Sequence, residues 1–63
     1  MKITIKTAKL VLLSFREEHG ITLEKVSKKT GVAISTLIAI ESGKVKPQAI
    51  TVFKINNFLK TFS

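Results

Sequence analysis

Residues Thr22 to Pro47 read TLEKVSKKTGVAISTLIAIESGKVKP, and this stretch decides the fold. Apolar residues recur at helical spacing before Gly31 and again after it, and the second run ends at Gly43. Glycine suits the left-handed backbone that ends a helix or makes a tight turn. The stretch therefore predicts two short helices joined by a turn at Thr30-Gly31-Val32, followed by a basic loop.

Two short helices joined by a glycine-containing turn of three or four residues form a helix-turn-helix. In that motif the second helix usually enters the major groove of DNA. Because a chain of 63 residues has room for little else, we expect this segment to set the function.

The flanking sequence predicts two further helices, so the expected fold class is all-α: a compact four-helix domain spanning 1–63, preceded by a short N-terminal strand or arm. The four helices are expected at 7–19, 22–30, 33–42 (the recognition helix) and 47–60. Residues 2–6 alternate lysine and threonine with isoleucine, which is a strand signal. A strand cannot exist alone, so three alternatives stay open for 1–6: a frayed arm, a strand paired with a second copy, or a segment packed on the body.

Apolar residues at helical spacing also predict the core. The first helix presents an inner stripe of Ala8, Val11, Leu12 and Phe15. The last helix presents a second stripe of Val52, Ile55, Leu59 and Phe62.

Composition limits the classes of function. Eleven lysine and arginine residues against four acidic residues give a net charge of +7, which favours a polyanionic partner such as nucleic acid. The chain has no cysteine and a single histidine, so we expect no disulfide and no metal site. The glutamates are scattered, so we expect no catalytic residue, no cofactor and no enzymatic activity. No apolar run approaches the roughly 20 residues of a membrane span, and we expect a cytoplasmic location in a bacterium or a phage-infected host cell.

A set of residues at joint spacing resembles the phage repressor and Cro (XRE-type) family of helix-turn-helix proteins. The set is Gly20-Ile21-Thr22, Val26, Gly31-Val32, Ser35-Thr36-Leu37, Ile40-Glu41, Gly43-Lys44 and Pro47. The resemblance runs from about Leu12 to Leu59. It implies a bundle of four or five helices that binds double-stranded operator DNA as a homodimer and represses or switches transcription.

The resemblance also implies roles for particular residues. Base-facing positions on the recognition helix are Ile34, Ser35, Ile38 and Ala39. Phosphate-facing positions are Thr22, Thr36, Lys44 and Lys46. Arg16 and Glu41 match a pair that forms an internal salt bridge between the first helix and the end of the third.

Two features depart from the family pattern. The reading face of the recognition helix is mostly aliphatic, and aliphatic groups touch a thymine methyl but do not read donors and acceptors. The sequence also ends after the fourth predicted helix, so we expect no fifth.

The exposed apolar residues leave two alternatives open. The candidates for a partner interface are Leu10, Leu13, Ile34, Ile38, Ile50 and Phe53. In one alternative, the first and last helices supply a homodimer interface. In the other, the recognition helix docks on a protein such as a repressor, as an antirepressor or antitoxin-type switch does.

Overall fold

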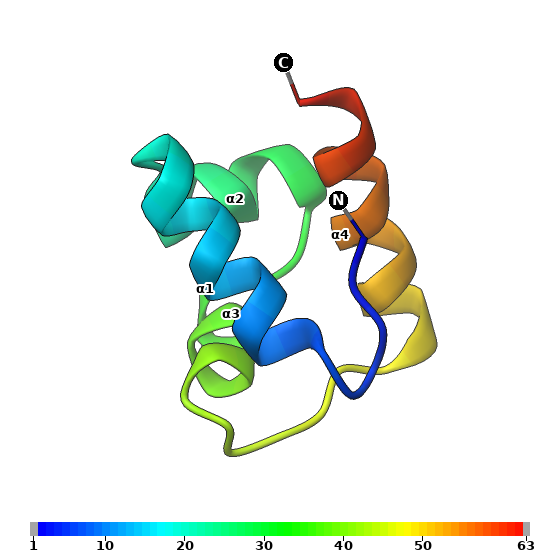
Figure 1. Ribbon diagram of the computed structural model, residues 1–63. Helices are drawn as coiled ribbons and strands as arrows, with labels where there is room; N and C mark the ends of the chain where they lie inside the picture. The colour runs from blue at the N-terminus through cyan, green and yellow to red at the C-terminus, as the bar shows by residue number, and fades with distance from the viewer. Residues whose placement is uncertain (1, 63) are drawn as a thin grey trace.

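The structure is a computed structural model that describes residues 2–62, and it places four helices within them. They are α1 (Ala8–His19), α2 (Leu23–Thr30), α3 (Ile34–Glu41) and α4 (Ala49–Thr61). In Figure 1, α1 crosses in front of α3, α4 stands beside them, and the N-terminal arm runs along α4 before it turns into α1. Residues 2–62 contain no strand, so the predicted all-α fold class is confirmed.

Local chemistry places the helix ends within one or two residues of the expected positions. The Thr22 hydroxyl caps α2 by accepting a hydrogen bond from the Lys25 amide at 3.2 Å, so Thr22 itself stays extended. Gly31 ends α2 with a φ of 77°, which only glycine adopts readily. We expected the last helix to begin at Pro47, but Gln48 after it is extended and α4 begins at Ala49.

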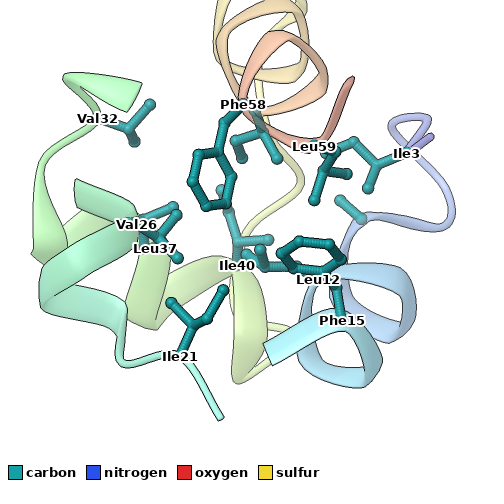
Figure 2. Close-up of a cluster of buried hydrophobic side chains, with 12 residues drawn as sticks. Ile3, Leu12, Phe15, Ile21, Val26, Val32, Leu37, Ile40, Phe58 and Leu59 are labelled. Carbon is teal, nitrogen blue, oxygen red and sulfur yellow. The ribbon is translucent and has the colours of Figure 1, made fainter. Parts of the chain in front are cut away.

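The core gathers side chains from every helix, the turns and the arm (Figure 2). Its buried members are Ile3, Ala8, Leu12, Phe15, Ile21, Val26, Val32, Leu37, Ile40, Ile55, Phe58 and Leu59. Most of the predicted stripes are among them, while Val11, Val52 and Phe62 are half-buried at the margin. Phe58, which borders the predicted stripe, is buried, and it packs edge-on against Phe15 with ring centroids 5.9 Å apart.

Residues 2–6 of the N-terminal arm form no strand within the chain, and the arm packs on the body of the domain through Ile3. The Ile3 side chain is 1% exposed and lies in the core. The Asn56 side chain holds the backbone of Ile3, since Oδ1 accepts from its N–H at 2.7 Å and Nδ2 donates to its carbonyl at 2.9 Å. Asn56 thus supplies the donor and acceptor that a neighbouring strand would supply, and no strand pairing is needed.

This amide pair makes Asn56 a test of the arm. We expect Asn56→Ala to lower the free energy of unfolding by about 1–2 kcal/mol, because two hydrogen bonds at a half-buried site are lost. Urea denaturation followed by circular dichroism measures this loss. Asn57→Ala, at an exposed position one residue along the same helix, is the matched control and should change the stability by less than about 0.5 kcal/mol. Equal losses in the two variants would show that Asn56 does not anchor the arm.

Candidate nucleic-acid interface

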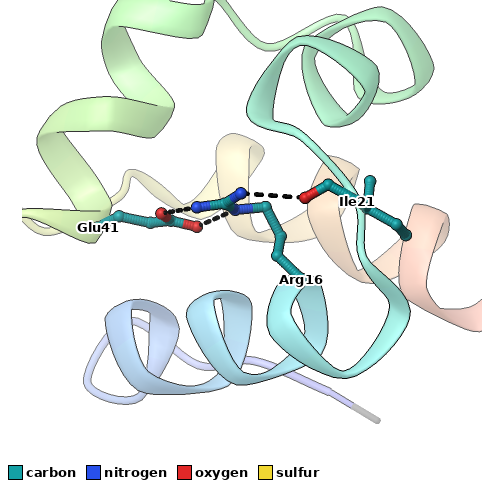
Figure 3. Close-up of polar contacts among 3 residues, drawn as sticks. All are labelled: Arg16, Ile21 and Glu41. Carbon is teal, nitrogen blue, oxygen red and sulfur yellow. Dashed lines mark hydrogen bonds and ion pairs between the residues drawn. The ribbon is translucent and has the colours of Figure 1, made fainter.

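Arg16 connects α1 to the end of α3 and to the segment that leads into α2 (Figure 3). Its Nε and Nη2 atoms donate to the two carboxylate oxygens of Glu41 at 2.7 and 2.6 Å, and this pairing joins α1 to the end of α3. Its Nη1 atom donates to the carbonyl of Ile21 at 3.0 Å, one residue before the cap of α2. Arg16 therefore fixes the end of α3 relative to the start of α2.

Arg16 stays charged over the whole pH range used for proteins. The hydrogen bond to Glu41 raises the pKa of Arg16 above its already high ordinary value, against a smaller opposing effect of burial. The two side chains are 21% and 10% exposed, so water screens the pair only in part.

Helix α3, the predicted recognition helix, buries one face and exposes another. Leu37 and Ile40 lie in the core. Ile34 and Ile38, one turn apart, are 39% and 52% exposed. Ser35 between them is also exposed. Of the predicted base-facing residues, Ile34, Ser35 and Ile38 therefore share the open face, and Ala39 is half-buried at its edge.

The loop after α3 brings lysines from three segments together. Gly43, with a φ of 78°, turns the chain out of α3, and the Lys44 amide donates back to the Ala39 carbonyl at 3.0 Å. Lys9 of α1 lies over this glycine, since a β-carbon placed on Gly43 would lie 3.2 Å from the Lys9 Nζ atom. Lys9 and Lys46 line one hollow together with Lys6 of the arm. Sequence reasoning left the roles of Lys6 and Lys9 undecided, because no local pattern shows which lysines meet a distant loop.

The predicted phosphate-facing residues fall into two groups. Thr36 lines a second hollow together with Lys46 and the start of α4, so the structure brings these two residues to one place. Lys44 is exposed in the same loop. Thr22 lies on another element, at the exposed start of α2, where its hydroxyl oxygen serves as the cap and its O–H remains a donor.

Charge is distributed unevenly along the chain. All four acidic residues lie between Glu17 and Glu41, and Glu41 is paired with Arg16. The charged residues are all basic in the arm, in the first half of α1, in the loop after α3 and in α4. Lys6, Lys9, Lys44 and Lys46 thus lie in stretches of the sequence that contain no acidic residue.

The remaining candidates for a partner interface lie on α1 and α4. Leu10 is 70% exposed, and on α4 Ile50 and Phe53 are 56% and 61% exposed. Leu13 is half-buried, so it offers less surface than expected. Two further exposed apolar residues, Ile5 and Val45, escaped sequence reasoning because they belong to the arm and the loop, where no helical period marks a face.

Within residues 2–62, the histidine and glutamate side chains form no group suited to holding a metal ion. No helix in this part of the chain has the length and apolar character that crossing a membrane requires.

The turn between α2 and α3, the open face of α3 and the basic loop beside it define a helix-turn-helix domain. The helix-turn-helix family model matches residues 12–61. The chain belongs to this family, which is the repressor/Cro (XRE) type that its sequence resembles.

Two archaeal proteins are similar to the chain. One, from Methanocaldococcus jannaschii, is an uncharacterized HTH-type transcriptional regulator that is 46% identical over 44 residues, a match covering 70% of this chain and 67% of the relative. The other, an uncharacterized HTH-type transcriptional regulator from Archaeoglobus fulgidus, is 39% identical over 41 residues, which cover 65% of this chain and 59% of the relative. The chain therefore spans less than two thirds of the second relative's length. No solved structure gives a significant match.

Proposed function

We propose that the protein is a transcriptional regulator that binds double-stranded DNA through α3 and acts as a repressor/Cro-like protein by occupying an operator. The observation that carries the proposal is the open face of α3 beside a cluster of lysines, in a chain of the helix-turn-helix family. The similar archaeal proteins, which are HTH-type transcriptional regulators, support it. The proposed activity is binding alone and involves no catalytic residue, metal or cofactor.

Contacts to the DNA backbone supply most of the proposed affinity. Lys44 and Lys46 in the loop are the main phosphate contacts, with Thr36 beside them and Thr22 at the start of α2. We propose Lys6 and Lys9 as further contacts to the DNA backbone, because they share a hollow with Lys46.

Base reading is proposed for the first turns of α3. Ser35 offers a hydroxyl, while Ile34, Ile38 and Ala39 offer aliphatic contacts to thymine methyl groups. Because this set makes few hydrogen bonds, part of the specificity comes from the shape and deformability of the DNA.

Fluorescence anisotropy tests the proposal with labelled duplexes from around the protein's own gene and scrambled duplexes of equal length. We expect one native duplex to bind more tightly than its scrambled control, and both affinities to fall between about 50 and 200 mM salt. Equal, weak binding to every duplex would contradict the proposal, because it would leave only nonspecific attraction between the lysines and phosphate.

We also propose that the regulator works as a two-fold homodimer. A dimer places two recognition helices about one DNA turn apart, and Leu10 of α1 with Ile50 and Phe53 of α4 supplies exposed apolar surface. We expect Phe53→Asp to shift sedimentation equilibrium toward the monomer by about tenfold in Kd or more, because a carboxylate enters the apolar contact. Thr51→Asp, a half-buried position on the same helix, is a control for added charge. A parent protein that stays monomeric at about 100 μM would exclude this dimer.

A second candidate function is protein binding through the same helix. The exposed pair Ile34 and Ile38, one helical turn apart, favours it, since an apolar helix face docks in hydrophobic grooves. The partner would be a repressor or another protein, as for an antirepressor or antitoxin.

Two substitutions of opposite charge at Ile38 separate the candidates. If DNA is the ligand, Ile38→Asp should weaken duplex binding roughly tenfold or more by repulsion, and Ile38→Lys should keep it within about threefold or strengthen it. If a protein is the ligand, both variants remove the apolar contact and both should abolish the complex. Anisotropy with duplex DNA and affinity capture from a lysate of the source organism measure the two outcomes. Duplex binding that stays unchanged in the aspartate variant would contradict DNA binding by this face.

A further inference from the structure

The turn that leads into α3 is held by side chains of α2. The Val32 amide donates to the Thr30 hydroxyl oxygen at 3.1 Å, and the Val32 carbonyl accepts from the Ser27 hydroxyl at 2.7 Å. Thr30 in turn donates to the Val26 carbonyl at 2.7 Å, which fixes the orientation of its hydroxyl. The Val32 side chain is buried in the core. Val32, which lies between Gly31 and the cap residue of α3, is therefore held by hydrogen bonds to both of its backbone groups and by the burial of its side chain.

The start of α3 has no side-chain cap, and the same holds for α1 and α4, whereas α2 is capped by Thr22. The cap residue of α3 is Ala33, whose side chain makes no capping hydrogen bond. Serine, threonine, aspartate or asparagine at that position stabilises the first turn by about 1 kcal/mol. The cap residue Ala33 follows Val32 directly, and α3 begins at Ile34. The position of the first turn of α3 therefore depends on how firmly the backbone of Val32 is held.

We infer that Ser27 and Thr30 are positioning residues for the recognition helix: their hydroxyls, by holding the Val32 backbone, set the first turn of α3 in place of a helix cap. For DNA reading the inference rests on the proposed function, because Ile34 and Ser35 of that turn are the proposed base contacts. The effect on the first turn of α3 is a property of the free protein, so it is measured in the absence of DNA.

Amide hydrogen exchange of the free protein tests the inference by NMR. The reporters are the amides of Thr36 and Leu37, which donate to the Ala33 carbonyl in the first turn of α3. We expect Ser27→Ala and Thr30→Val each to speed their exchange about tenfold, as the loss of one hydrogen bond does, while the buried Leu59 of α4 keeps its rate within about twofold. If amide exchange became equally faster in α3 and α4, Ser27 and Thr30 would only stabilise the whole domain, and the inference would be overturned. Unchanged exchange rates in α3 would also overturn it.

The chain supplies matched controls. Thr61→Val removes a hydroxyl that donates to the Asn57 carbonyl at 2.9 Å in α4, so it repeats the chemical change of Thr30→Val at a hydroxyl that is bonded within another helix. It should leave the exchange of Thr36 and Leu37 unchanged. Thr30→Ser keeps the hydroxyl and should restore the parent rates, and failure of this rescue would also overturn the inference.

Duplex binding gives the second readout. If the free-protein result holds and the parent protein prefers one duplex, we expect Ser27→Ala and Thr30→Val to reduce that preference about fivefold or more. The slope of affinity against salt should stay constant, because the loop lysines are untouched. If the parent protein shows no preference, the proposed function fails while the exchange data still decide the roles of Ser27 and Thr30.

Discussion

Replacing Lys44 and Lys46 together with alanine should weaken duplex binding roughly tenfold to a hundredfold at about 0.1 M salt. Each phosphate contact contributes roughly 0.9 to the slope of log affinity against log salt, so the double variant should lower the magnitude of that slope by about 1.8. Both lysines are exposed in the loop beside α3, and Lys46 shares a hollow with Thr36, so their removal takes charge from the proposed backbone contacts. Anisotropy titrations at several salt concentrations measure both quantities.

A second double variant separates position from net charge. Lys54 and Lys60 are exposed on α4, so Lys54→Ala with Lys60→Ala removes the same charge from another element. We expect its salt slope to stay within about 0.3 of the parent value, since no phosphate contact is lost. If the two double variants weakened binding equally, the lysines would act through net charge alone, and the loop would not be part of the interface.

The second large effect is expected on stability. Arg16→Met should lower the free energy of unfolding by about 2–4 kcal/mol, because it leaves the Glu41 carboxylate, 10% exposed, without its bidentate partner and the Ile21 carbonyl without its donor. A domain of this size has a total stability of roughly 3–9 kcal/mol. The variant should therefore melt about 10–25 °C lower, or be largely unfolded. Thermal and urea denaturation followed by circular dichroism measure the loss.

The double variant Arg16→Met with Glu41→Met keeps the prediction testable where the single variant does not fold. Replacing both partners removes the uncompensated charge, so this variant should be more stable than Arg16→Met alone. Lys29→Met, an exposed cation of α2, should change the stability by less than about 0.5 kcal/mol. A single variant as stable as the parent would show that the pair does not hold α1, α2 and α3 together.

The pH dependence of this loss follows from the raised pKa of Arg16. A group whose pKa is higher in the folded state contributes its full stabilisation at pH values below its unfolded-state pKa. That contribution is lost only as the pH rises through the folded-state pKa. Since the ordinary pKa of arginine already lies above the alkaline range used for proteins and the folded pKa is higher still, the contribution is complete throughout that range. The difference in unfolding free energy between the parent and Arg16→Met should thus be equal at about pH 7 and pH 10.

Local sequence determined the helices and much of the core. The boundaries depend on neighbouring residues, such as the Thr22 cap and the glycines at 31 and 43 with positive φ. The buried faces follow from the 3.6-residue period, which correctly assigned Leu12 and Phe15 of α1 and Ile55 and Leu59 of α4. The family resemblance led to Arg16 and Glu41, which the structure brings together. The base-facing and phosphate-facing residues stay predictions.

Tertiary structure alone decided how distant segments meet. Ile3 lies 53 positions from Asn56, and no local pattern indicates that an amide side chain replaces a strand partner for the arm. The meeting of Lys6, Lys9 and Lys46 around one hollow depends likewise on how the arm, α1 and the loop pack. Helix formation is governed by interactions within a few residues, whereas these contacts exist only after the core has closed and set the distances between elements.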